Sequence, residues 1–512
     1  MKTARKYHDL SPENFDLLIK ENIELKTALE SAERKLNYFI EQAKLAQMRK
    51  FGKKTENANQ LELDFSQAFD EGELTEEAQE IPEEPESITV PAHIRKKKSV
   101  GRKIDTTNLP REQIIHDLSE EEKICKCCSE QLTKFGEDKS EQLEYIPAQI
   151  KVIEHVCNKY ICKHCEIIKS ATKPEMPIAK SMAAPSLITE VIIRKFEHHL
   201  PWYRQSKIFM QDGINIPANT ICNWYLQAGE ILKPLQEAAR LQLTQVKALQ
   251  ADETTVKILK DDIKGYMWAY HSCEPKNRFI IFEYNDTRAG EVVNNTLENY
   301  QGILQTDGYS GYNAMRNKKG VINLGCWAHC RRKFAEVVKI STTAGKAHEV
   351  VKWIGKLYAV EDEAREQKLS FAARKNLRQL KSVPILEKLN KVIVQSTTLS
   401  QSALGKAITY ATNQWEYLTK YVNYGEAEID NNWCENQIRP FALGRKNWLF
   451  IGNKDSAQVA AFFYGIIQTC RLNNIDPRKY IIYALANAGK IRRQELDATS
   501  LLPQFIDRTL LE

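Results

Sequence analysis

Four strand-like stretches, with one helix-like segment between the third and the fourth, constrain the fold of this chain more than any other feature. Between residues 246 and 340 the strand-like stretches are VKALQADETTVKIL, GYMWAYHSC, RFIIFEYN and GILQTDG, and the helix-like segment is RAGEVVNNTLENY. Stretches rich in β-branched and aromatic residues are typical of strands. A helix that connects two strands is typical of a parallel pair. The region therefore predicts an α/β domain built on a sheet.

Two aspartates occupy comparable places in this pattern. Asp252 lies inside the first strand-like stretch, and Asp307 ends the fourth, with Gly308 allowing a tight exit. In an RNase H-like sheet this order makes the first and fourth strands parallel neighbours, so the two carboxylates meet at one edge. A third carboxylate from a later helix would complete the site. Glu435, in DNNWCENQIRPFALGRKNW, is the best candidate.

Three carboxylates in one place suit a pair of divalent metal ions. Mg²⁺ prefers oxygen ligands and keeps waters, so a few carboxylates suffice, and clustered like charges require a cation. In-line cleavage of a phosphodiester uses one ion near the attacking oxygen and one near the leaving oxygen. Taken singly, each aspartate is more often a cap or turn residue, and Asp430 and Glu428 are the first substitutes for Glu435. Candidate phosphate contacts downstream are Arg439, Arg445 and Lys446.

The length of 512 residues exceeds what one hydrophobic core supports, so we expect an α/β multidomain protein. Regions are assigned by composition and by the period of the apolar residues. They are a coiled coil (13–50), an acidic and then basic linker (51–110), a four-cysteine zinc-binding domain (111–180), a helical, helix–turn–helix-like DNA-binding region (181–245), the first part of an RNase H-like core (246–340), a helical stretch (341–424), the second part of the core (425–470) and a C-terminal helical element (471–512).

Residues 13–50 carry a heptad repeat. Apolar residues in two seams seven apart are typical of a coiled coil, and Asn22 on a seam would fix its register. The alternative is one amphipathic helix packed on its own domain, but an acidic, Pro-containing stretch follows and no adjacent core is evident. The favoured interpretation is oligomerisation. The seams are Leu18, Leu25, Ala32 and Phe39, and Asn22, Leu29, Leu36 and Ala43.

Charge is unevenly distributed, although the net charge is only +6. Residues 55–87 are acidic and lack Lys and Arg, which predicts a disordered linker. A basic run around one glycine follows and is a candidate DNA contact, with a solvated charge run as the alternative. The run consists of Arg95, Lys96, Lys97, Lys98, Arg102 and Lys103.

Two Cys-x-x-Cys pairs, about thirty residues apart, predict a structural Zn²⁺ site. Four thiolates from two such pairs form a closed tetrahedral arrangement. Neighbouring residues leave the ligand set open, since Cys127, Cys157 and His164 are spare candidates. A redox pair is the alternative, but the thioredoxin-like strand–turn–helix context is not evident. The four predicted ligands are Cys125, Cys128, Cys162 and Cys165.

Residues 203–228, YRQSKIFMQDGINIPANTICNWYLQA, suggest two short helices. Asp212-Gly213 interrupts the first helix, and Pro217 opens the second. Polar residues at the start of a second helix are the arrangement that enters the major groove, although any helical hairpin can look similar. Thr220 and Asn223 are therefore candidate DNA contacts.

Several blocks resemble the IS66-family insertion-sequence transposases. They are ADETTVKIL, LQTDGYSGYNAM, GCWAHCRRKF, DNNWCENQIRPFALGRKNWLFIGN and IIQTCRLNNIDPRKYIIYAL. The resemblance covers nearly the whole chain, including the leading coiled coil, the basic run and the four cysteines. Ser129 stands where the family usually has Gly, and Cys434 and Asn436 flank Glu435 where a small residue and Arg are usual.

The resemblance implies a DDE transposase with a retroviral-integrase-like catalytic fold. It implies that Asp252, Asp307 and Glu435 are the three acidic ligands of Mg²⁺ or Mn²⁺, two ions per active site, and that residues 341–424 are a helical insertion. Such an enzyme would bind the element ends, cleave them and join the 3′-OH to target DNA. The alternatives are a catalytically inactive or domesticated DNA-binding derivative and a metal-dependent nuclease that only cuts.

The block GCWAHCRRKF contains Cys326 and His329 at Cys-x-x-His spacing. A second metal site is one interpretation, but no second ligand pair is near in sequence, so packing at the mouth of the active site is favoured. Trp327 is expected to stack on a flipped base or, more commonly, to lie in the core. Arg331 and Arg332 on the following helix are candidate contacts to the DNA backbone.

The expected partners follow from these features. They are DNA, both element ends and target, a second copy of the chain through the coiled coil, and two small co-encoded accessory proteins of the kind that accompany the family. The N-terminus lacks the apolar segment of a secretory signal, and no run of about 18 apolar residues predicts a membrane span. We therefore expect a cytoplasmic, nucleoid-associated protein without a membrane segment.

Overall fold

A computed structural model divides the chain into two compact units, Met1–Leu74 with Val156–Glu512, and Thr75–His155. The catalytic candidates lie in the first unit. Among the described helices, none is both long and apolar enough to cross a membrane. The structure describes residues 12–51, 113, 127, 149–161, 168–171, 175–272, 274–340, 345–396 and 398–512.

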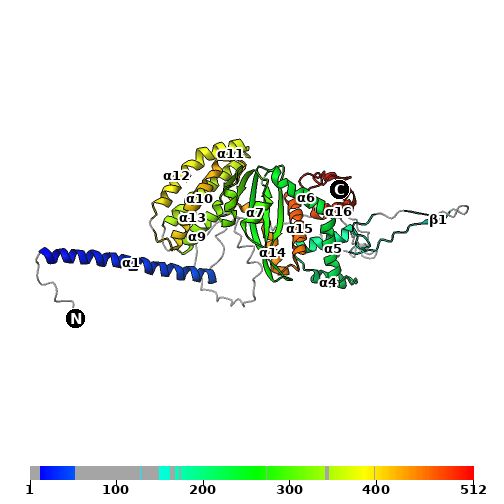
Figure 1. Cartoon of the computed structure of the whole chain (residues 1–512), viewed down its shortest axis with the longest axis horizontal. Helices are drawn as coiled ribbons and strands as arrows, with labels where there is room; N and C mark the ends of the chain where they lie inside the picture. The colour runs from blue at the N-terminus through cyan, green and yellow to red at the C-terminus, as the bar shows by residue number, and fades with distance from the viewer. Residues whose placement is uncertain are drawn as a thin grey trace. The chain divides into compact units, whose positions relative to one another are not determined.

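A five-stranded sheet with the order β5-β4-β3-β6-β7 lies at the centre of the first unit (Figure 1). The β3–β4 and β4–β5 pairs are antiparallel, whereas the β3–β6 and β6–β7 pairs are parallel. Strands β3 and β6, the first and fourth of this sheet in chain order, are therefore parallel neighbours, as the strand order predicted. Helix α7 lies between β5 and β6 in the chain. The bounds are β3 Ala248–Ile258, β4 Ile263–Ser272, β5 Phe279–Asn285, α7 Gly290–Thr296, β6 Gly302–Gln305 and β7 Val321–Leu324.

The register of β3 against β6 determines which side chains share a face. Gln250 is aligned with Gln305, and Nε2 of Gln250 donates a hydrogen bond to Oε1 of Gln305 at 2.9 Å. Strand side chains alternate between the two faces. Asp252 lies two residues beyond Gln250, and Asp307 lies two residues beyond Gln305, just after β6 ends. The alternation therefore directs both carboxylates to the same face.

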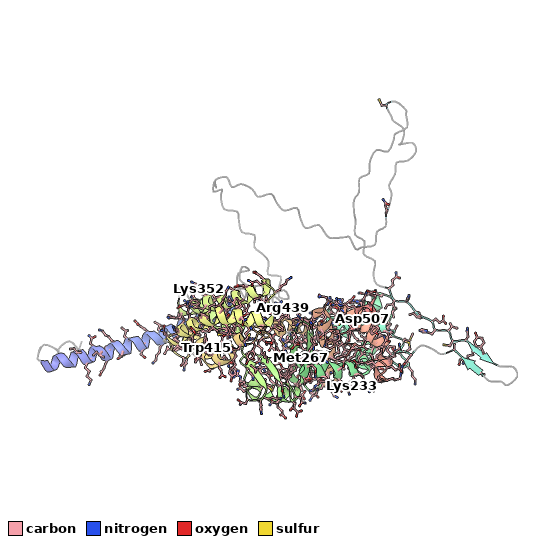
Figure 2. All side chains as sticks on the ribbon, turned by 90° about the horizontal axis from the view of Figure 1, so that it is seen from above. Lys233, Met267, Lys352, Trp415, Arg439 and Asp507 are labelled. Atoms are coloured by element: carbon pink, nitrogen blue, oxygen red, sulfur yellow. The ribbon has the colours of Figure 1, made fainter. Side chains whose placement is uncertain are left out.

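Helices cover both faces of the sheet. The first face packs against α14 (Asn432–Trp448) and α15 (Lys454–Leu472), and the second against α7 and α8 (Asn313–Arg316) with the 3-10 turn η2 (Ser310–Tyr312). Figure 2 labels Met267, which belongs to the first face, and Arg439 on α14. The first core includes Val256, Met267, Phe282, Phe441 and Phe463. The second includes Leu249, Trp268, Leu304, Val293 and Met315.

The chain between the two parts of the sheet domain is helical. No strand occurs among the described residues from 345 to 423. These helices and α9 share one apolar core, which includes Phe334, Ile354, Leu357 and Leu389. Trp415 of α13, labelled in Figure 2, contacts Trp327 of α9 edge-on at 6.0 Å between ring centroids. The elements are α9 Trp327–Ile340, α10 Lys346–Glu366, α11 Phe371–Leu377, a π-helical turn η3 Arg378–Ser382, α12 Val383–Val394, α13 Ala403–Thr419 and η4 Lys420–Asn423.

A second group of helices packs beyond α15. Helix α3 contacts α16 and α5, and α5 contacts α15. Phe196 on α3 stacks on Phe463 of α15, with 6.0 Å between ring centroids. The elements are α3 Pro185–Phe196, α4 Trp202–Gln211, α5 Ala218–Ile231, α6 Lys233–Leu241, η1 Gln242–Gln245, α16 Pro477–Ala486, α17 Ala488–Arg492 and η5 Arg508–Leu511, and a small hairpin of β1 Lys159–Ile161 and β2 Ile168–Ser170 precedes them.

Helices α4 and α5 occupy the segment that suggested a helix–turn–helix. Helix α4 ends at Gln211, Gly213 has a φ of +85°, and α5 begins after Pro217. A positive φ is accessible to glycine without steric cost, which suits Gly213 to the turn. Asn223 is exposed and Thr220 is half-buried. Contact of this pair with DNA stays a prediction.

The predicted coiled coil lies on helix α1 (Pro12–Phe51). Four apolar residues of the two seams, Leu25, Leu29, Leu36 and Phe39, are exposed by 60–68%. An isolated helix with an exposed apolar seam is stabilised when a partner helix covers it. Oligomerisation through α1 stays a prediction. The acidic stretch, the basic run and the four predicted zinc ligands lie outside the described residues.

Candidate active site

Asp252 and Asp307 meet at the carboxyl end of the β3–β6 pair. Asp252 has its own backbone contact, since the amide of Glu253 donates to its Oδ1 at 2.8 Å. Asp307 Oδ1 accepts a hydrogen bond from the amide of Tyr309 at 2.9 Å, which holds the carboxylate against the turn after β6. Both residues are half-buried. The strand pairing that the sequence predicted therefore brings the two carboxylates together.

Glu435 reaches the same place from the first turn of α14. Two buried side chains hold the start of this helix on β3. The Oε1 atom of Gln250 accepts a hydrogen bond from the amide of Cys434 at 3.0 Å, and Nδ2 of Asn431 donates to the carbonyl of Ala251 at 3.1 Å. The carboxylate of Glu435 is thereby placed beside Asp252.

Burial and neighbouring charges act on Asp252 and Glu435. Burial raises the pKa of Asp252 well above its usual range, and the charges of Glu435, Glu253 and Asp307 raise it further. Burial raises the pKa of Glu435 to about 7, with Arg332 opposing the shift and Asp430 and Asp307 adding to it. Clustered carboxylates of this kind are stable as anions only when cations neutralise them.

His329 and Arg332, on the first turns of α9, also face Glu435. Nδ1 of His329 lies 3.5 Å from Oε1 of Glu435, and Nη2 of Arg332 lies 3.8 Å from Oε2. Burial lowers the pKa of His329 to about 4, so the imidazole is uncharged near neutral pH and the contact is not a salt bridge there. Glu435 Oε1 and His329 Nδ1 are both buried and have no hydrogen-bond partner among the described residues.

The two substitutes for Glu435 are occupied by other contacts. Asp430 accepts hydrogen bonds from the hydroxyl of Tyr358 at 2.7 Å and from the amide of Asn432 at 3.1 Å. Glu428 pairs with Arg374 through two bonds of 2.9 and 2.6 Å. Of Glu428, Asp430 and Glu435, only Glu435 therefore has a buried carboxylate oxygen without a hydrogen-bond partner among the described residues.

A polar network lies on the other face of the sheet, around Glu253, the residue after Asp252 on β3. Glu253 is directed away from the carboxylates by the strand alternation and accepts hydrogen bonds from Arg288 Nε and the Tyr312 hydroxyl, each at 2.6 Å. The guanidinium of Arg288 lies 3.6 Å from the ring centroid of Tyr309, which follows Asp307. This network fixes the turn that presents Asp307.

The basic residues predicted near the site occupy different environments. Arg332 is exposed and Arg331 is half-buried on α9. Arg445 lies against β3, because its Nη1 donates to the hydroxyls of Thr254 at 3.1 Å and Thr255 at 2.9 Å. Arg445 therefore attaches α14 to the sheet. On the same helix, Lys446 is exposed and Arg439 is half-buried; a DNA contact stays a prediction for all five.

Trp327 and the two cysteines of GCWAHCRRKF are core residues. Trp327 is fully buried, and its Nε1 donates to the carbonyl of Leu418 at 2.7 Å. Cys326 and Cys330 are buried as well. Stacking of Trp327 on a flipped base is thus excluded by its burial. Sequence reasoning favoured packing of this Cys-x-x-His pair at the mouth of the active site, but it did not predict that His329 lies beside Glu435.

Chemically, the site combines three carboxylates, one imidazole and one exposed guanidinium. Hard carboxylate oxygens suit Mg²⁺ and Mn²⁺. The side chains of Cys326, His329 and Glu435 also form a group whose ligand atoms all lie within 4.8 Å of one another. The arrangement can bind divalent cations at a sheet edge beside a basic helix.

Comparison with known proteins gives a consistent result. The chain matches three family models: the IS66 family transposase over residues 180–459, the zinc-finger binding domain of transposase IS66 over residues 122–166, and "Transposase C of IS166 homeodomain" over residues 39–114. The second match supports a zinc-binding domain in the region of the two Cys-x-x-Cys pairs.

Two curated relatives come from Sinorhizobium fredii (strain NBRC 101917 / NGR234). The uncharacterized protein y4jD is 30% identical over 408 residues, which are 76% of this chain and 79% of that protein. The uncharacterized protein y4hP is 32% identical over 416 residues, or 76% of this chain and 74% of that protein. Since the first family model alone matches more than half of the sequence, the chain belongs to the IS66 family of transposases.

Proposed function

We propose that this transposase cleaves the ends of its element and joins the 3′-OH to target DNA by two-metal phosphoryl transfer. Asp252, Asp307 and Glu435 would be the metal ligands. One observation carries the proposal: carboxylates from β3, the end of β6 and α14 come together, so that burial and the charges of Glu435 and Asp307 raise the pKa of Asp252, and burial and the charge of Asp307 raise the pKa of Glu435. A cluster of this kind is suited to an external cation.

The residues present fit a divalent ion. Glu435 Oε1 is buried without a hydrogen-bond partner among the described residues, and a buried carboxylate oxygen usually has one. Bound Mg²⁺ or Mn²⁺, two per site, would supply Lewis-acid stabilisation of the attacking and leaving oxygens. The protein's own part is positioning: the two glutamines Gln250 and Gln305 hold β3, β6 and the start of α14 together.

The sheet supports an RNase H-like catalytic core. Counted from β3, the observed order is third, second, first, fourth, fifth, with the first and fourth strands parallel. The helical segment from 345 to 423 lies between Asp307 and Glu435 in the chain, as an insertion into such a core would.

DNA binding would use several surfaces. We propose the basic run at residues 95–103, helices α4 and α5, and Arg331 and Arg332 beside the carboxylates as contacts to phosphates. The zinc-binding domain lies in the sequence between the basic run and helix α4. A zinc ion on Cys125, Cys128, Cys162 and Cys165 would stabilise this domain. Helix α1 would pair protomers, because two element ends must be held together. The protein would act in the cytoplasm, with two small co-encoded proteins as candidate partners.

A strand-transfer assay tests the proposal. Purified protein is incubated with labelled element-end DNA, a target plasmid and Mg²⁺ or Mn²⁺, and both cut and joined products are measured. We expect both products with the parent and neither with Asp307→Ala. Asp261→Asn, an exposed aspartate in the turn after β3, is the matched control and should behave as the parent.

The other outcomes separate the alternatives. Equal activity of the parent and Asp307→Ala would remove Asp307 from the catalytic site. Cut products without joined products would support a nuclease that only cuts. End binding without either product, under conditions with the co-encoded proteins added, would support an inactive DNA-binding derivative.

A further inference from the structure

We propose that His329 is a fourth ligand of the metal site and binds, through Nδ1, the divalent ion held by Glu435. The inference rests on the proposed function, since it assumes that the carboxylates bind metal. It changes the ligand set from three oxygens to three oxygens and one nitrogen. Nothing in the family assignment of the chain identifies this residue as a ligand.

The geometry of the two atoms carries the inference. His329 Nδ1 and Glu435 Oε1 are 3.5 Å apart. Two ligands that lie about 2.0–2.2 Å from one ion, at roughly a right angle, are about 3 Å apart. Both atoms are buried and have no hydrogen-bond partner among the described residues. The Glu435 side chain is 6% exposed and that of His329 24%. A shared cation would satisfy both atoms.

The two carboxylate oxygens of Glu435 face different side chains, so only Oε1 is directed at His329. Oε2 lies 3.8 Å from Nη2 of Arg332. The carboxylate is thus oriented with one oxygen toward an exposed cation of the protein and the other toward the imidazole. A metal between Glu435 and His329 would have one oxygen ligand and one nitrogen ligand from these two side chains.

The position of His329 is fixed independently of Glu435. Cys326, three residues before it, accepts a hydrogen bond at Sγ from the amide of Asn431 at 3.3 Å. This bond links the residue before α9 to the residue before α14, so the first turns of the two helices are held together. Cys330 is fully buried one residue after His329. The imidazole is therefore preorganised, as a metal ligand needs to be.

Cys326 is not the ligand that this site would use, although it belongs to the same group of three. Its Sγ already accepts the bond from Asn431, and burial raises the pKa of its thiol well above the usual range. A protonated thiol is a poor ligand. Cys326 is a positioning residue for His329 in this arrangement.

A nitrogen ligand has a consequence for metal preference. Imidazole suits transition-metal ions, whereas Mg²⁺ prefers oxygen. We therefore expect His329→Gln to lower the affinity for Mn²⁺ by about tenfold or more, the scale found when even an outer partner of a metal ligand is lost. The affinity for Mg²⁺ should fall less. His198→Gln, an exposed histidine outside the site, is the matched control and should change neither.

Electron spin-echo spectroscopy of Mn²⁺ bound to the full-length protein tests the inference directly. The parent should show modulation from a directly bound ¹⁴N nucleus, which ¹⁵N-histidine labelling should change. In His329→Gln the modulation should be absent while Mn²⁺ still binds. The labelling experiment needs no variant, so it shows whether any histidine nitrogen binds the ion even if His329→Gln does not fold.

The outcomes separate this inference from the proposed function. If Mn²⁺ binding depends on Asp307 but shows no histidine nitrogen in the parent, the carboxylate site stands and the role of His329 is overturned. If the nitrogen signal persists in folded His329→Gln, the inference is likewise overturned. If the parent does not bind Mn²⁺, or if Asp307→Ala binds Mn²⁺ as the parent does, both proposals fail together.

Discussion

Two clusters of buried charge in this protein are built in opposite ways. The first lies in the helical segment and consists of Glu361, Arg374, Arg378 and Glu428. The second is the candidate active site at the edge of the sheet. Both contain a buried glutamate, Glu361 in the first and Glu435 in the second, but only Glu361 accepts hydrogen bonds from buried arginines.

In the helical cluster every charge has a geometric partner. Glu361 is fully buried on α10 and accepts bonds from Arg374 Nη2 at 2.7 Å and Arg378 Nε at 2.8 Å. Arg378, also fully buried, donates in addition to the carbonyls of Tyr421 at 3.1 Å and Ala427 at 2.8 Å. Buried ion pairs are stable when the geometry is good and the remaining polar atoms are satisfied.

The carboxylate cluster lacks this neutralisation. The exposed Arg332 lies 3.8 Å from Glu435, and the neighbouring imidazole is uncharged near neutral pH. Burial and mutual repulsion raise the pKa of both Asp252 and Glu435. This difference in pairing separates buried charges that stabilise the fold from buried charges that are suited to binding a ligand. Protein cations complete the helical cluster, whereas an external cation would complete the other.

The largest expected effect is on catalysis. Asp252→Asn should lower strand cleavage and joining by about a thousandfold, because metal ions contribute several kcal/mol of transition-state stabilisation. The free energy of unfolding should not decrease, since the substitution removes a charge from a repulsive cluster. Initial rates and urea unfolding are measured on the same preparation, with Asp261→Asn as the control. Parent-like rates in Asp252→Asn would contradict the assignment.

The next largest effect is on stability and comes from the other cluster. Glu361→Gln should lower the free energy of unfolding by about 3–5 kcal/mol, because it leaves two buried guanidinium groups without their shared anion. Glu363→Gln, on the same helix, removes an exposed partner of Lys381 and should cost at most about 1 kcal/mol. Chemical denaturation compares the two. Equal losses would show that the buried pairing is not what distinguishes this cluster.

A smaller effect of opposite sign is expected at Glu435. The pKa of Glu435 is raised from 4.5 to about 7 in the folded protein. Protonated Glu435 therefore contributes its full stabilisation below the pKa of the unfolded state, and this stabilisation is lost as the pH rises through 7. Without Mg²⁺, Glu435→Gln should therefore raise the Tm by a few degrees at pH 8 and by nothing near pH 4. Thermal unfolding at both pH values measures this. A lower Tm at pH 8 would contradict the repulsive character of the site.

The smallest expected signal is the number of protons released when Mg²⁺ binds. Because the raised pKa of Glu435 leaves part of the population protonated at pH 6.5, Mg²⁺ binding should release a fraction of a proton. Calorimetric titration in two buffers of different ionisation enthalpy measures that fraction. Glu435→Gln should release fewer protons per bound ion. Unchanged release in this variant would assign the titrating group elsewhere.

The sequence was most informative about the sheet. Strand-like runs and one crossover helix, read as an RNase H-like sheet, placed Asp252 and Asp307 on parallel neighbours, because strand alternation is a local property and a helical crossover is typical of a parallel pair. The strand β7, VINL, was not recognised, since a four-residue run has too little pattern to separate it from a loop.

Contacts between distant segments were not readable. The choice of Glu435 over Asp430 and Glu428 rested on family resemblance, because the contacts that occupy the other two come from Tyr358 and Arg374 on distant helices. The pairing of Arg374 and Arg378 with Glu361 also joins different helices, and the sequence does not indicate it. The contacts of Arg445 with Thr254 and Thr255 were likewise not readable, and its predicted contact with phosphate stays a prediction.

Binding of Mn²⁺ to paired variants of adjacent acidic residues tests the metal site most directly. The full-length parent, Glu435→Gln and Asp430→Asn are titrated with Mn²⁺ at pH 8, and free Mn²⁺ is followed by electron paramagnetic resonance. We predict that Asp430→Asn binds Mn²⁺ as the parent does, because its side chain remains hydrogen-bonded to Tyr358. Glu435→Gln should lose at least one ion. Parent-like binding by Glu435→Gln, with loss in Asp430→Asn, would contradict the proposed site.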